Sequence, residues 1–147
     1  MLKDSIKELF ERDLLKLKEE ISLYKDDVLI WKLKPGINNT AGNLCLHLIG
    51  NLNHFIGAML GNTGFIRERD KEFSSKDIPK SKMISEIEKT ISMVNVSISG
   101  LSEEDLNKIF PLEMFGKQVS TSWMLLNLLT HLNYHLGQIN YHRRLVL

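Results

Sequence analysis

The chain has 147 residues, of which 43% are apolar and 7% aromatic, and its 19 Lys and Arg residues balance 18 Asp and Glu residues. This length is enough for one domain, which we take as residues 1–147, and the balanced charge supplies no basic field for nucleic acid. The single cysteine, Cys45, excludes an internal disulfide. The N-terminal segment MLKDSIKELFERD is charged where a signal peptide needs an apolar core, so we expect a soluble, cytoplasmic protein.

The first predicted helix covers residues 2–24, where apolar residues recur at steps of three and four with Lys and Glu between them. Residues 25–39 are rich in Asp, Asn, Pro and Gly, so we expect the chain to turn there, with Trp31 as an apolar anchor. A polar cap at or just before Thr40 predicts a second helix that runs to about Leu60.

Residues 61–80 form a connector with Gly, Ser and Pro, which is long for a bundle loop and is therefore either a crossover or part of a site. A third helix is predicted over residues 81–98, a short helical turn after Ser102, and a last helix over about 121–144. No segment predicts a β-strand, so the fold class is all-α, a four-helix bundle. Three glycines inside the predicted helices are expected to allow close helix approach: Gly50, Gly57 and Gly137.

Charged residues are absent from two long segments, residues 36–66 and 118–142. Both segments are rich in amide side chains, which would lack partners in hydrocarbon, so buried helices of a soluble protein are favoured over membrane spans. All five histidines of the chain lie in these two segments: His47, His54, His131, His135 and His142.

The spacing of the histidines indicates a metal site. His131 and His135 are one helical turn apart and project from the same side, as two ligands of one ion must. His47 and His54 are about 10 Å apart along a helix axis, so only one of them can supply the third ligand, and spacing alone leaves both open. The same distance excludes His142. The alternative is that these histidines are polar residues at the edge of the core, hydrogen-bonded to their neighbours.

Other polar residues near the predicted site have candidate roles. Gln138 and Asn51 lie on or near the histidine stripes, where they can support a ligand or orient a substrate. Arg67 and Arg69, in the long connector, can pair with a substrate carboxylate, or can simply be solvated surface residues. His54 is expected either to support the metal ligands from behind or to face substrate, and the alternative is a buried histidine with its hydrogen bonds satisfied.

The segments HLIGNLNH and HLNYHLGQ, which begin at His47 and His131, resemble the DinB-like superfamily of metal-binding four-helix bundles, specifically an uncharacterised branch of it. The resemblance covers nearly the whole chain and implies an up-down-down-up helix order, which would explain the long connector between the second and third helices. It also implies a divalent ion, zinc or nickel, held by residues that correspond by position to His47, His131 and His135. One departure is Leu136, where relatives often have Arg.

The same resemblance implies a metal-dependent enzyme, either a hydrolase or a thiol-dependent S-transferase. Its small-molecule substrate would include a low-molecular-weight thiol, whose pKa a bound ion would lower. The alternative is a non-catalytic bundle that binds metal or a partner, and a metal-dependent sensor lies between the two. We expect a homodimer, because charge-free helices suit an interface as well as a core, and we expect no nucleic-acid or membrane partner.

Overall fold

The computed structural model describes residues 1–147. The segments with helical periodicity form four long helices in it. These helices are α1 (Leu2–Ser22), α3 (Ala41–Leu52), α6 (Lys80–Ser99) and α7 (Thr121–Leu145). The shorter elements are α2 (Asp27–Ile30), the π-helical segment η1 (Asn53–Ala58), α4 (Met59–Gly61), α5 (Arg69–Ser74) and the 3₁₀ turn η2 (Asp105–Asn107). The fold is all-α as predicted, and its only β pairing consists of two isolated bridges between residues 109 and 120.

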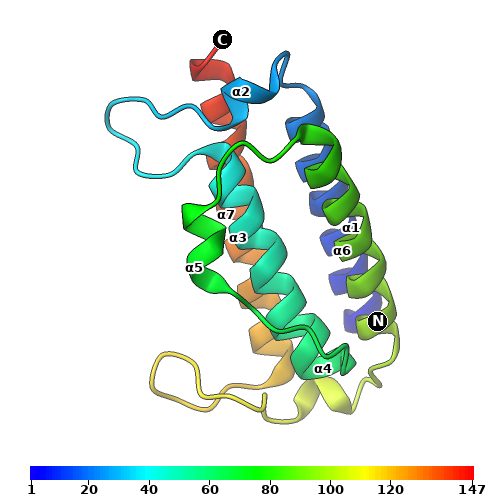
Figure 1. Ribbon diagram of the computed structural model, residues 1–147. Coiled ribbons are helices and arrows are strands. Elements are labelled where there is room, and N and C mark those ends of the chain that lie inside the picture. The colour runs from blue at the N-terminus through cyan, green and yellow to red at the C-terminus, as the bar shows by residue number, and fades with distance from the viewer.

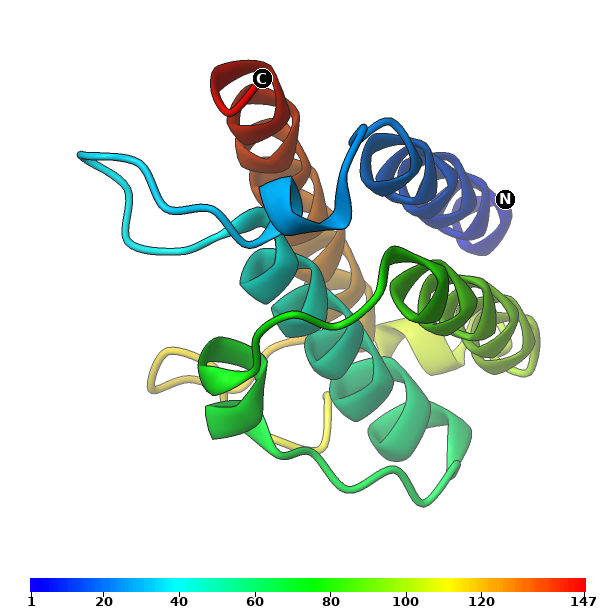
Figure 2. The same cartoon turned by 45° about the horizontal axis from the view of Figure 1, so that its top comes forward.

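The four long helices form a bundle in which α1 packs against α6 and α7, and α3 packs against the same two helices (Figures 1 and 2). Figure 1 shows α1 and α7 running upward and α3 and α6 running downward. The chain leaves α4 at the lower end and returns to the upper end through residues 62–79, a connector that carries α5 against α3. The connector is thus a crossover and, as shown below, also part of the site.

Local signals explain where the two histidine-bearing helices begin. The Thr40 hydroxyl accepts a hydrogen bond from the Asn43 N–H at 3.1 Å, and the Ser120 hydroxyl accepts one from the Trp123 N–H at 3.1 Å. Both are N-caps that satisfy a backbone donor at the start of a helix. The helix that starts at α3 continues through η1 and α4 and ends at Asn62, which has a left-handed φ of 50°.

Residues 41–61 are long and apolar enough to cross a membrane by length and composition alone. In this fold the segment is the central helix of the bundle, and eleven of the twelve residues of α3 are buried. Such burial is typical of a core helix. Cys45 lies in this core as a free thiol, and burial raises its pKa to about 12.

Candidate metal centre

Three imidazoles from two packed helices meet in the bundle. His47 projects from α3, and His131 and His135 project from α7 one turn apart. The Nε2 atom of His131 lies 3.2 Å from Nε2 of His47 and 3.1 Å from Nε2 of His135, and one nitrogen of each ring lies within 4.8 Å of the others. Of the two residues that spacing left open, the structure therefore brings His47, and not His54, to the pair on α7.

The spacing of these nitrogens fits a divalent ion. Two imidazole nitrogens bound to one zinc ion at about 2.0–2.1 Å lie about 2.9–3.4 Å apart at octahedral or tetrahedral angles. The two short Nε2 separations, 3.2 and 3.1 Å, fall within that range. Zinc and nickel both accept imidazole ligands, and three protein ligands leave positions for water or substrate.

A carboxylate from the connector holds the ring of His47. Nδ1 of His47 donates to Oε1 of Glu72 at 3.0 Å, and Arg67 donates to both oxygens of the same carboxylate at 2.8 and 2.9 Å. Because Nδ1 carries the proton, the lone pair of Nε2 faces the other two histidines. Burial lowers the pKa of His47 against the opposing effect of Glu72, which favours the neutral ring that a metal requires.

The two histidines of α7 are held differently. Nδ1 of His135 lies 2.6 Å from Oε1 of Gln138 and donates to it, so its Nε2 also faces the centre as an acceptor. Nδ1 of His131 is buried and has no hydrogen-bond partner. Burial, followed by the nearby His135 and His47, lowers the pKa of His131 to about 4, so this ring is neutral at physiological pH.

Glu72 is the functional residue that sequence reasoning missed. It is 7% exposed although it belongs to a short, charged helix, α5, that no periodicity predicted. Its carboxylate rests against Gly50 of α3, where an added Cβ would lie 1.8 Å from Oε2. The signal in the sequence was this glycine, which lies one turn after His47 and makes room for a carboxylate of α5 where we expected a close approach between helices.

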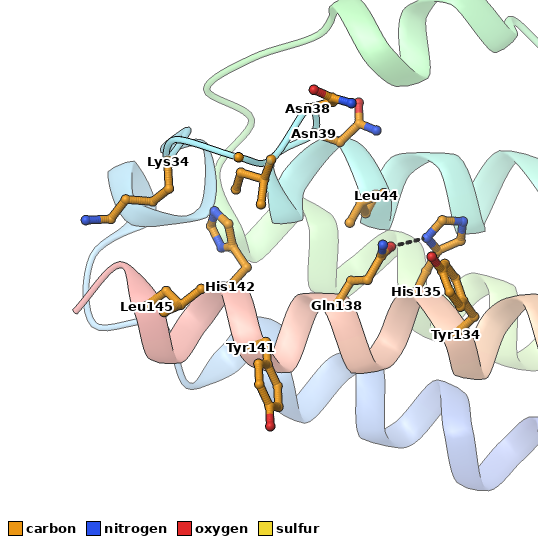
Figure 3. Close-up of a pocket in the computed structure, with 12 residues that line it drawn as sticks. Lys34, Asn38, Asn39, Leu44, Tyr134, His135, Gln138, Tyr141, His142 and Leu145 are labelled. Atoms are coloured by element: carbon orange, nitrogen blue, oxygen red, sulfur yellow. Dashed lines mark hydrogen bonds between the residues drawn. The ribbon is translucent and has the colours of Figure 1, made fainter.

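Two cavities meet the histidines from opposite directions along α7. One of about 290 Å³ reaches His131 from the side of Met124, and His47, Asn51 and Phe55 of the α3–η1 helix also line it. The other, of about 510 Å³, reaches His135 from the side of His142 and lies under the loop of residues 34–39 (Figure 3). The centre thus lies where two separate spaces converge.

The other predicted site residues lie at different places. Gln138 contacts His135, and Asn51 lines the smaller cavity. Arg67 and Arg69 line the same cavity, but the guanidinium of Arg67 is paired with Glu72. His54 lies outside the histidine cluster, where its ring packs edge-on against Phe55 with ring centroids 4.7 Å apart. Burial lowers the pKa of His54 as well.

His142 belongs to a separate structural contact. Its Nε2 donates to the Lys32 carbonyl oxygen at 2.7 Å, so its Nδ1 accepts from the Tyr24 hydroxyl at 2.6 Å. Both ring nitrogens are therefore used to join α7 to the segments that follow α1 and α2. This placement agrees with the exclusion of His142 from the metal ligands.

Comparison with solved structures identifies proteins of the same fold. The chain is similar to a DinB-like protein from Bacillus cereus ATCC 10987 with a TM-score of 0.72 and 21% sequence identity, over 96% of this chain and 90% of that chain. The resemblance to DinB-like bundles is thereby confirmed at the level of the fold. A family model described as a protein of unknown function, DUF1572, matches residues 2–146, and the chain belongs to that family. A comparison with curated proteins gave no significant match.

Proposed function

We propose that this protein binds a zinc or nickel ion through His47, His131 and His135. The observation that carries the proposal is the convergence of three imidazoles, two of which have Nδ1 fixed as a donor by Glu72 and Gln138. This is the arrangement by which proteins orient metal-binding histidines. A fully structural role for the histidines would leave the close approach of their three Nε2 atoms without a purpose.

We further propose that the centre is enzymatic and transfers a group between a low-molecular-weight thiol and a second small molecule. Two cavities reach the centre, which suits two substrates better than the single substrate of a hydrolase. When bound, a divalent ion lowers the pKa of a coordinated thiol or water and so supplies a nucleophile near neutral pH. Glu72 and Gln138 orient the histidines, and apolar walls such as Phe55 and Leu128 limit the access of water.

We also propose that the protein is cytoplasmic and forms a homodimer, and an exposed apolar surface supports the dimer. The outer face of α7 carries large apolar residues that are at least one-third exposed: Trp123, Leu126, Tyr134, Tyr141 and Leu145. Such a face also favours the alternative function, a non-catalytic metal-binding bundle that recognises a partner. Light scattering tests the dimer, and turnover of thiols with electrophiles by the metal-loaded protein distinguishes the two functions.

Elemental analysis of untagged protein tests metal binding. We expect near-stoichiometric zinc or nickel in the wild type and in His54→Ala, and loss of the metal in His47→Ala and His131→Ala with helix content preserved in circular dichroism. His54→Ala is the matched control, because it removes an imidazole from the same continuous helix outside the cluster. Metal retained by both His47→Ala and His131→Ala, or wild type that stays metal-free after reconstitution, would refute the site.

A further inference from the structure

The amide of Asn51 is buried without a hydrogen bond. The residue is 8% exposed, its Oδ1 is buried without a partner, and its Nδ2 forms no hydrogen bond within the chain. Burying an amide in this state is unfavourable, and such groups are rare in folded proteins. Asn51 lies one turn after His47 and lines the smaller cavity. Its free amide therefore faces the space next to the histidines.

The same cavity has a second amide on its opposite wall. Asn127 lies one turn before His131 on α7, which runs antiparallel to α3, and its side chain also has no hydrogen bond within the chain. The remaining wall between the two helices is apolar and includes Phe55, Met124 and Leu128. An apolar space with a few convergent polar groups is typical of a small-molecule site.

The charge of the cavity is positive. Its charged lining residues are Arg67 and Arg69, and the charge of Arg67 is balanced by Glu72. Arg69 forms no ion pair, and its guanidinium lies 5.5 Å from the centre of the Phe73 ring. One positive charge is therefore left without a carboxylate partner at the mouth of a cavity that holds two free amides.

From these contacts we propose that the smaller cavity binds a small molecule that carries a carboxylate, with Nδ2 of Asn51 donating to it and Arg69 supplying the opposite charge. Asn51 is thus a substrate-binding residue and not a metal ligand. The role of this molecule as a substrate depends on the proposed function, but its binding does not. The volume of about 290 Å³ is at the lower end for ligand pockets and suits a short-chain acid. The larger cavity, beside His135, remains for the thiol.

Succinate and its neutral diamide, succinamide, provide matched probes. Both are titrated at pH 7.5 into metal-free and zinc-loaded protein, by calorimetry and by following the side-chain amide signals of Asn51 and Asn127 in ¹H–¹⁵N spectra. We expect saturable binding of succinate to both forms and at least tenfold weaker binding of succinamide. Binding to the metal-free form separates recognition by the cavity from chelation by the ion.

Three variants test the assignment. Asn51→Leu and Arg69→Gln are expected to weaken succinate binding at least fivefold, while Asn39→Leu, the same change in the larger cavity, leaves it unchanged. Thermal melts and metal content of each variant show that the fold and the centre are intact. No binding of succinate to the wild type, equal binding of succinamide, or unchanged binding by Asn51→Leu would each overturn the proposal. Succinate binding without stoichiometric metal would instead refute only the proposed function.

Discussion

Gly50→Ala is the sharpest test of how the centre is supported, because the three atoms nearest to an added Cβ all belong to the Glu72 side chain. An added Cβ would lie 1.8 Å from Oε2 and 2.6 Å from Cδ of Glu72, whereas ordinary contacts begin at 3.4 Å. The carboxylate must therefore retreat by about 1.6 Å, the difference between 3.4 and 1.8 Å. Its bonds to Nδ1 of His47 at 3.0 Å and to Arg67 at 2.8 and 2.9 Å do not survive such a movement together.

The size of the effect follows from two opposing contributions. Replacing glycine by alanine inside a helix stabilises it by about 1 kcal/mol. Breaking a buried ion pair on one side costs about 3–5 kcal/mol, so the net loss is about 2–4 kcal/mol. With an unfolding entropy of about 2.1 cal/mol/K per residue, this lowers the Tm of a chain of this length by about 6–13 °C. Loss of the support behind a metal ligand weakens metal binding by about 10- to 100-fold.

Gly137→Ala is the matched control. Gly137 is only two residues from His135, but an added Cβ there meets nothing within 4 Å. We therefore expect a Tm about 2–3 °C higher and unchanged metal affinity. Calorimetric melts and competition with a chromogenic chelator measure both quantities for the two variants. Wild-type stability and affinity in Gly50→Ala would refute the placement of Glu72 against α3.

The remaining predictions concern stability. Asn51→Leu removes a buried amide that has no hydrogen bond, and we expect it to raise the free energy of unfolding by about 1–2 kcal/mol in urea titrations. Asn43→Leu is expected to lower the free energy of unfolding, because the Asn43 amide donates two hydrogen bonds of 2.9 Å to connector carbonyls. For the metal-free protein, a His131 pKa of about 4 against the ordinary 6.5 means that the unfolded chain binds more protons between these values. Stability should therefore fall as pH drops from about 6.5 to 4, less steeply in His131→Ala, and a pH-independent Tm in that range would contradict the burial of this ring.

The parts of the fold that could be predicted are those determined by local pattern. The four long helices follow their apolar periodicity to within two residues at most ends, because each must bury one stripe against its neighbours. The Thr40 cap was also visible, because a side-chain oxygen at that position satisfies a nearby backbone donor. The proximity of His131 and His135 on α7 could be predicted from helix geometry alone.

The choice between His47 and His54 could not be made from spacing, because the helix that carries them is not uniformly α-helical. Residues 53–58 form wider π turns, so the residues after Leu52 rotate away from the stripe that starts at His47. Phe55, and not His54, follows Asn51 at the cavity wall. Asn53 instead faces α6, since its amide donates to the Ile49 carbonyl and to the Thr90 hydroxyl of α6. The pattern of apolar residues in the sequence does not show where an α-helix changes to a π-helix.

Glu72 was beyond sequence reasoning because tertiary contacts hold the connector in place. The Asn43 amide donates to the carbonyls of Glu72 and Ser75, and Trp31 packs on Gly42 while donating to the Ile78 carbonyl. Small and amide residues on the outer face of α3 therefore bind the backbone of the connector and leave one carboxylate pointing inward. A charge-free helix can hold His47 in the histidine cluster in this way, because the single charge that orients the ring is brought by another segment together with Arg67, which neutralises it.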